Sequence, residues 1–228
     1  MDLHLHSHER LKLGKLLNPV RGLIDATAAL VALLGGVVLF VLGAGDLPRQ
    51  LSLLIYAITT VSLYTVSTLY HSVPWREVWK HRMQRLDHSM IYLLVAGTYT
   101  PLAAIVLDGW IRATTLLVIW GIALVGVGQK LLLPRIKTWF TVTMTTTQGW
   151  LALLLLIPLS QVLPWPALAL AIVGGVLYTV GMVFLVTERP RLWPRVFSYH
   201  EAMHVLVVGG TFCHWLMTAR YVAPFAGA

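Results

Sequence analysis

Residues 22–43 read GLIDATAALVALLGGVVLFVLG and contain a single ionisable side chain. As a helix this stretch would extend about 33 Å, enough to cross the roughly 30 Å hydrocarbon core of a bilayer. The whole chain of 228 residues is similar in character, since 57% of it is hydrophobic and only 11% is charged. Soluble domains carry roughly a quarter charged residues. The sequence therefore predicts an integral membrane protein.

Seven stretches are long and apolar enough to cross a bilayer as helices. The fifth is the most polar, because its first half contains five threonines and Gln148. Such polar groups commonly bond to neighbouring helices. The expected fold class is all-α, a polytopic seven-transmembrane helix bundle whose longest connection covers about 72–87. The predicted spans are 22–43, 51–71, 88–107, 113–132, 141–163, 166–187 and 200–222.

The distribution of positive charge predicts the orientation of this bundle. Of the 17 lysines and arginines, all but Arg49, Arg112 and Arg220 lie on the side that contains the N-terminus. Because cytoplasmic segments are enriched in these residues, we expect a cytoplasmic N-terminus and an external C-terminus in the cell membrane, plasma or inner. The expected organisation is an N-terminal segment 1–21, a transmembrane domain 22–222 and an external tail 223–228. The basic residues are spread over several short clusters, so no nucleic-acid partner is expected.

Four ionisable residues fall at one end of the predicted bundle. His71 ends the second span, Asp87 precedes the third, and His200 and His204 begin the seventh. Ionisable groups at such positions are costly, which makes each a candidate functional residue. Ser67 shares a helical face with His71. Its hydroxyl is expected either to assist at a metal site or to bond to a carbonyl of its own helix.

The spacing of the histidines predicts a metal centre. His200 and His204 lie one helical turn apart on the same face, so both rings can bind one metal ion. With His71 they form a set of three histidines and an open fourth position, which is typical of catalytic zinc. Zinc activates water for attack on a carbonyl, and Asp87 is placed to carry the proton, with Ser67 assisting. The alternative is that these histidines only form bonds between helices.

Residues 200–204, HEAMH, also match the H-E-x-x-H signature of zinc proteases. Intramembrane zinc proteases add an aspartate, and the sequence offers Asp108 between Leu107 and Gly109. Asp108 lies 21 residues beyond Asp87, or roughly 32 Å along a helix, and is therefore expected at the opposite membrane face. This argues against a protease and leaves Glu201 as a bystander at the membrane interface.

Three motifs occur in order along nearly the whole chain. They are residues 67–71 (STLYH), residues 85–89 (RLDHS) leading into 96–101 (AGTYTP), and residues 200–210 (HEAMHVLVVGG). Together they resemble the hemolysin III family, the bacterial branch of the progestin and adipoQ receptor superfamily. The resemblance implies a cytoplasmic N-terminus and a zinc site with three histidine ligands and an aspartate that acts through water. It also implies ceramidase-like amide hydrolysis, membrane lipid homeostasis or hemolysis. The matching positions are Ser67, His71, Asp87, His200 and His204.

The start of the first span departs from the family pattern, in which a histidine or an acidic residue in a short motif is common. Here Arg21 and Asp25 are four residues apart and are spaced to pair on one helix. The alternating His4, His6 and His8 in the N-terminal tail are a further, weaker candidate for metal binding.

Three functions agree with these residues. The first is a zinc-dependent hydrolase of an amide or ester of a membrane lipid, with zinc as the cofactor and the lipid as the partner. The second is a non-enzymatic, receptor-like regulator of membrane fluidity in which zinc is structural. The third is a cytolytic pore former, against which the spans argue because they lack a polar stripe that would line a channel.

Overall fold

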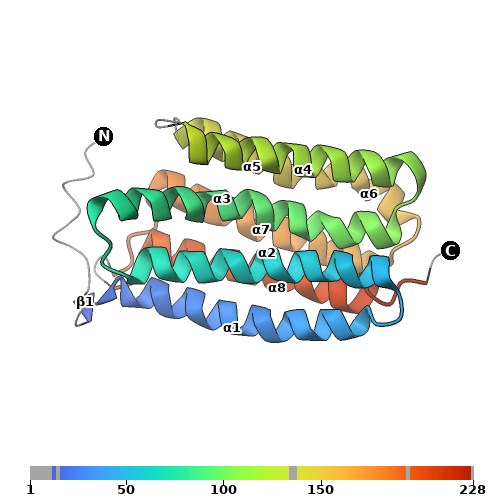
Figure 1. The fold of residues 1–228 in the computed structure, drawn as a ribbon, viewed down its shortest axis with the longest axis horizontal. Helices are drawn as coiled ribbons and strands as arrows, with labels where there is room; N and C mark the ends of the chain where they lie inside the picture. The colour runs from blue at the N-terminus through green and yellow to red at the C-terminus, as the bar shows by residue number, and fades with distance from the viewer. Residues whose placement is uncertain (1–11, 14–15, 134–137, 194–195, 227–228) are drawn as a thin grey trace.

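The computed structural model describes residues 12–13, 16–133, 138–193 and 196–226, and these residues form an all-α bundle (Figure 1). Among them, seven helical segments are long and apolar enough to cross a membrane. The predicted seven-helix fold is therefore confirmed, while the orientation in the membrane stays a prediction. The segments are Pro19–Leu42, Leu47–Ser72, Glu77–Val106, Gly109–Leu132, Phe140–Ser160, Trp165–Thr187 and Tyr199–Val222.

Several of these spans consist of more than one helical element. The third joins α3 to the π-helical segment η2, the fifth joins α5 to α6, and the seventh joins α8 to the π-helical segment η3. A two-residue antiparallel strand pair, β1 (Lys12–Leu13) and β2 (Leu16–Leu17), precedes the bundle. The helical elements are α1 (Pro19–Leu42), α2 (Leu47–Ser72), α3 (Glu77–Pro101), η2 (Leu102–Val106), α4 (Gly109–Leu132), α5 (Thr138–Trp150), α6 (Ala152–Ser160), α7 (Trp165–Thr187), α8 (Tyr199–Met217) and η3 (Thr218–Val222).

The third helix begins at Glu77 and not near residue 88, so the prediction of a long connection over 72–87 is wrong. Residues 77–87 are too polar to be predicted as membrane-spanning, but they contain no glycine or proline and many good helix formers. A side-chain contact of 3.9 Å between His81 and Glu77 spans one turn of this extension. Asp87 consequently lies inside α3 rather than before it.

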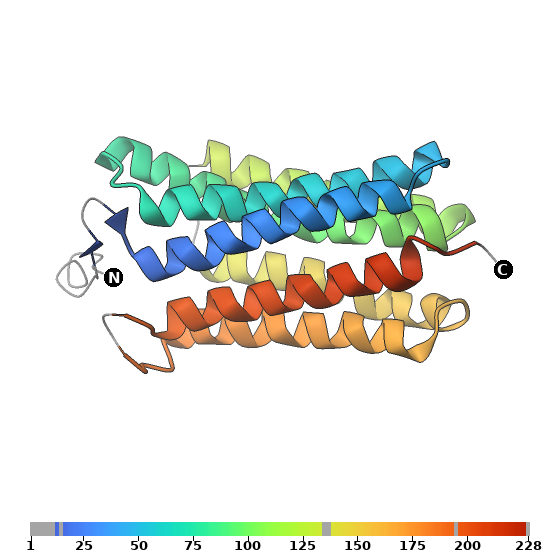
Figure 2. The same cartoon turned by 90° about the horizontal axis from the view of Figure 1, so that it is seen from below.

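The packing order brings the first and last spans together. α1 packs on α2, α2 on α3, α3 on α4 and α7 on α8, and α1 also contacts α8. Figure 2 shows α1 in blue beside α2, and α8 in red beside α7. The approach of α1 to α2 depends on Gly22, because a Cβ at this position would overlap the Ser72 hydroxyl. The ends of α1, α2 and α8 that lie next to β1 therefore form one compact cluster.

Candidate metal centre

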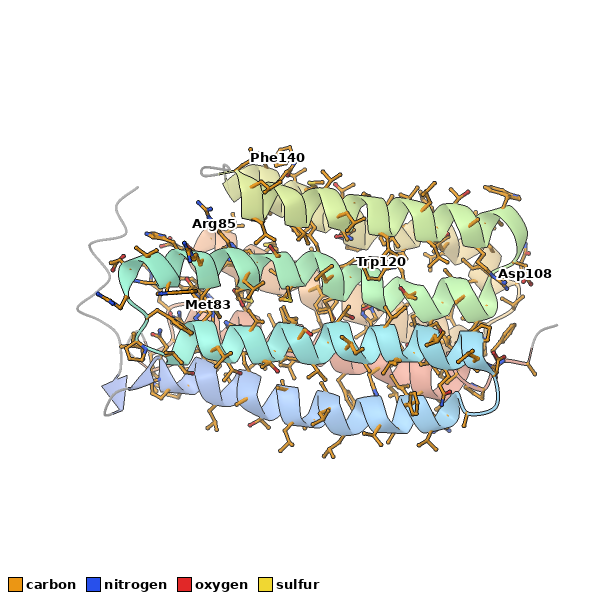
Figure 3. All side chains as sticks on the ribbon, viewed as in Figure 1. Met83, Arg85, Asp108, Trp120 and Phe140 are labelled. Carbon is orange, nitrogen blue, oxygen red and sulfur yellow. The ribbon has the colours of Figure 1, made fainter. Side chains whose placement is uncertain are left out.

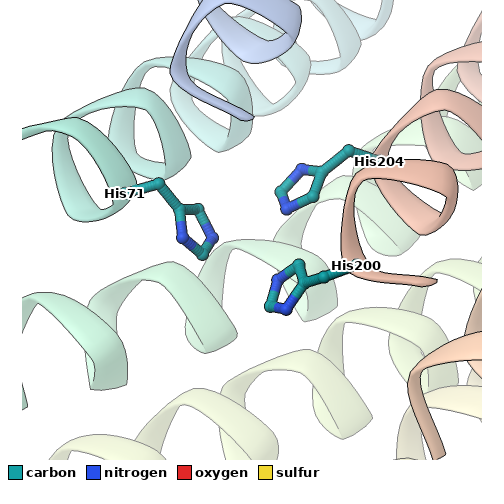
Figure 4. Close-up of side chains that lie close together, drawn as sticks. All are labelled: His71, His200 and His204. Atoms are coloured by element: carbon teal, nitrogen blue, oxygen red, sulfur yellow. The ribbon is translucent and has the colours of Figure 1, made fainter. Parts of the chain in front are cut away.

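The three predicted histidine ligands converge (Figure 4), one from the last turn of α2 and two from the first two turns of α8. The ring centroids form a nearly equilateral triangle, with 5.2 Å from His71 to His200, 5.0 Å from His71 to His204 and 5.1 Å from His200 to His204. One ring nitrogen of each histidine lies within 4.8 Å of the others. The predicted set of three is thus brought together by α2 and α8.

Local sequence explains why the histidines lie at the helix ends. Pro74 follows Val73, and a residue before proline disfavours the α conformation. Val73 is extended, so α2 ends at Ser72 and His71 lies in its last turn. A capping box between Ser198 and Glu201 starts α8 at Tyr199, which places both α8 histidines in its first two turns.

His204 has a partner that the sequence did not reveal. Its Nδ1 lies 2.9 Å from Oδ1 of Asp25, whose Oδ2 accepts a hydrogen bond of 2.8 Å from the Ser67 hydroxyl. Only 1% of the Asp25 surface is exposed. The spacing of Arg21 and Asp25 suggested a pair on α1, but Arg21 pairs with Glu201 instead. The sequence does contain one indication of this contact, because Asp25 lies inside a long apolar run and an acidic residue there needs a partner.

The second ring nitrogen of His204 points to a ligand. Its Nε2 is buried and has no hydrogen-bond partner among the described residues. A buried polar atom without a partner is costly, and a metal ion would satisfy it. Tetrahedral zinc bonds at about 2.0–2.1 Å place its nitrogen ligands about 3.4 Å apart. The observed limit of 4.8 Å is wider, so the rings would close in slightly around zinc. Three imidazoles also suit other transition metals, so zinc itself stays a prediction.

The two predicted catalytic residues lie beside the histidines. Asp87 is buried in α3, where Ser67, His204 and Asp25 are near enough to influence its carboxylate electrostatically. Ser67 is also buried, and its hydroxyl donates to Asp25 rather than to a carbonyl of its own helix. The geometry therefore connects both residues with the histidine cluster, and their catalytic roles stay predictions.

A comparison with known families agrees with this site. The family model described as "Haemolysin-III related" matches residues 16–215. The chain belongs to the haemolysin-III family. It is 35% identical to "Hemolysin-3" of Bacillus cereus over 172 residues, which are 75% of each chain. It is 30% identical to "Hemolysin-3 homolog" of Bacillus subtilis (strain 168) over 190 residues, which are 83% of this chain and 84% of the relative. The predicted resemblance is confirmed.

Membership in the haemolysin-III family and seven membrane-spanning helices together indicate a multi-pass protein of the plasma membrane. The three histidines, the aspartate and the serine named by the resemblance gather at one end of this bundle. The tail histidines His4, His6 and His8 lie outside the described residues.

The structure corrects the interpretation of Glu201 as a bystander at the membrane interface. Glu201 is buried, with 6% of its surface exposed. Its Oε1 accepts from Nε of Arg21 at 2.5 Å, and its Oε2 accepts from the backbone N–H of Ser198 at 2.8 Å. Because both carboxylate oxygens are engaged in holding α8 to α1 and in capping α8, Glu201 is a structural residue.

The protease alternative does not fit this geometry. The glutamate of an H-E-x-x-H protease acts as a general base, whereas both oxygens of Glu201 are engaged. Asp108 lies at the far end of the bundle, as the labels of Asp108 and Arg85 show in Figure 3. There it is exposed and pairs with Arg112 at 2.6 Å. Asp108 is therefore too distant to join the histidines at a metal.

Proposed function

We propose that this haemolysin-III protein is a metal-dependent hydrolase that cleaves an amide or ester bond of a membrane lipid. Zinc is the proposed metal, and His71, His200 and His204 would hold it. The observation that carries the proposal is the buried Nε2 of His204, which has no partner among the described residues and belongs to a cluster of three histidines. When bound, zinc would supply a Lewis acid and an activated water.

The position of the site favours a lipid substrate. His71 lies in the last turn of α2 and His200 in the first turn of α8, so both are near the end of the spans. With the spans across the bilayer, the site would lie at the depth of the lipid carbonyl groups, at the border between the hydrocarbon core and the headgroups. A lipid amide or ester can therefore reach this depth without leaving the bilayer.

Asp87 is the proposed proton carrier. Its carboxylate is buried beside the histidine cluster, where it can accept a proton from water and return it to the leaving amine or alcohol. Loss of such general acid–base catalysis lowers rates by about 10²–10⁴-fold. Asp87 would not be a direct ligand of the metal in this proposal, so its replacement separates catalysis from metal binding.

The test compares purified protein with Asp87→Asn and His204→Ala variants. Metal content is measured by mass spectrometry, and hydrolysis is measured with a ceramide and with a phosphatidylcholine in mixed micelles. We expect one zinc per chain, retained in Asp87→Asn with turnover reduced at least 100-fold, and lost in His204→Ala. A wild-type protein without metal, or an Asp87→Asn variant with full turnover, contradicts the proposal.

A structural role for the metal is the second candidate, because the histidines link α2 to α8 across a large separation in sequence. In that case Asp87→Asn retains function, and replacement of a histidine lowers the stability of the bundle. The name of the Bacillus cereus relative, "Hemolysin-3", suggests cytolysis as the third candidate. Release of a dye from liposomes by the purified protein would support it, and we expect none.

A further inference from the structure

We propose that Asp25 is a positioning residue that fixes the tautomer and the orientation of the His204 ring, so that Nε2 faces the space between His71 and His200. The inference rests on the proposed metal site and assigns to α1 a part in that site, although α1 contributes none of the three histidines. The inference follows from the hydrogen-bonding properties of the Asp25 carboxylate and of the His204 ring.

For an ionised Asp25 and a neutral His204 ring, the contact between them has one arrangement of the proton. A neutral imidazole has one nitrogen that donates and one that accepts. An ionised carboxylate only accepts, so the proton lies on Nδ1 of His204, 2.9 Å from Oδ1 of Asp25. The lone pair is then on Nε2, which is the buried nitrogen without a partner among the described residues. Without Asp25 the ring would be free to exchange tautomers and to rotate.

Asp25 is itself held in place. The Ser67 hydroxyl donates to Oδ2 at 2.8 Å, so both carboxylate oxygens of Asp25 are engaged. One turn earlier on α1, Arg21 is bound to Glu201 of α8. The carboxylate is therefore supported from α2 and α8, and a support of this kind transmits orientation to the ring that it contacts.

Residues that support metal-ligating histidines from behind commonly contribute 10–100-fold to metal affinity. The matched experiment compares Asp25→Asn with Glu201→Gln. Each variant removes one negative charge from the contacts between α1 and α8. Asp25 bonds to the ring of His204, whereas Glu201 bonds to Arg21 and to the backbone N–H of Ser198. Zinc affinity, measured by competition with a chromophoric chelator, is expected to fall 10–100-fold in Asp25→Asn and less than threefold in Glu201→Gln.

The tautomer provides a readout that needs no metal. Side-chain ¹⁵N chemical shifts of metal-free protein labelled in histidine distinguish the Nδ1–H and Nε2–H forms, and loss of one signal in His204→Gln assigns the ring. We expect Nδ1–H in the wild type and in Glu201→Gln, and a mixture in Asp25→Asn. A wild-type His204 in the Nε2–H form overturns the inference even if Asp25→Asn does not fold.

The two readouts also separate this inference from the proposed function. If the wild type binds no zinc, the proposed hydrolase is refuted, and the tautomer of the metal-free protein still decides the role of Asp25. If the wild type binds zinc and Asp25→Asn shows unchanged affinity with an unchanged tautomer, the metal site stands and Asp25 has no positioning role.

Discussion

Replacing Arg21 with methionine is expected to destabilise the bundle, because it leaves a charged Glu201 buried without its ion-pair partner. The pair is close, at 2.5 Å between Nε of Arg21 and Oε1 of Glu201, and 17% and 8% of the two side chains are exposed. Removing one partner of a buried pair costs about 3–5 kcal/mol. We take the lower end, about 3 kcal/mol, because Oε2 of Glu201 keeps its bond to Ser198.

The two single variants are expected to differ. In Glu201→Gln the cap of α8 is retained, because glutamine also serves in a capping box. Arg21 has the more exposed side chain and can extend its guanidinium toward the membrane surface. We therefore expect a cost of only about 1 kcal/mol for Glu201→Gln. The double variant has neither charge and should fall within about 1 kcal/mol of the wild type.

Unfolding in detergent micelles, followed by tryptophan fluorescence as the denaturing detergent is increased, gives the four free energies of this double-mutant cycle. With costs of about 3 and 1 kcal/mol for the singles and a double variant within about 1 kcal/mol of the wild type, the expected coupling energy between the two residues is about 3–5 kcal/mol. Equality of the double variant with the sum of the singles would refute the reasoning, since the two costs would then be unrelated to the ion pair. If Arg21→Met and Glu201→Gln lowered the free energy of unfolding equally, the difference in side-chain exposure would not explain their effects.

Three further predictions concern the rest of the bundle. Gly97→Ala should cost about 1–3 kcal/mol in the same assay, because a Cβ there overlaps the Thr59 side chain, whereas Gly121→Ala, with nothing within 4 Å, should not destabilise. Gln148→Leu should change the free energy of unfolding by less than about 1 kcal/mol. The change removes two long hydrogen bonds of 3.3 and 3.2 Å, but it also removes a buried amide oxygen that has no partner among the described residues. A larger loss of stability would contradict this reasoning. A reporter that is active only in the cytoplasm should work at the N-terminus and fail at the C-terminus, and the reverse result would overturn the orientation predicted from charge.

Hydropathy predicts the number of spans because the bilayer requires a fixed length of apolar helix. It predicts helix boundaries less well, as α3 shows. Residues 77–87 form the start of that helix although they are polar, since a helix can extend beyond the apolar core into water where polar side chains are solvated. Asp87 was therefore expected outside the helix on which it lies. The prediction that Asp87 lies near the histidines does not depend on this boundary, because Asp87 is at the start of the apolar part of the span whether residues 77–87 form a loop or a helix.

The histidines of the site could be predicted because a metal restricts both the type and the spacing of its ligands. The residues that contact these histidines from other helices show no characteristic spacing, because a buried carboxylate needs only one partner, which can lie on any neighbouring helix. Asp25 illustrates the difficulty, because Arg21 lies only four residues away and is an attractive local partner. The sequence alone suggests that Arg21 pairs with Asp25 on α1. In the structure each binds α8 instead, Arg21 to Glu201 and Asp25 to His204.

The first two turns of α1 show how a helix without ligands can set the geometry of this site. Asn18 donates to the backbone carbonyl of His71 at 3.4 Å, Arg21 and Asp25 reach α8, and Gly22 allows contact with the end of α2. Asn18 is the N-cap residue that precedes α1, whereas Arg21, Gly22 and Asp25 lie in its first two turns, where Asp25 is three or four residues from the other two and shares their side of the helix. Rotating α1 by one residue, about 100°, would remove all of these contacts at once. The register of α1 against α2 and α8 is therefore fixed at the same residues that hold two of the three histidines, and a change in that register must alter the metal site.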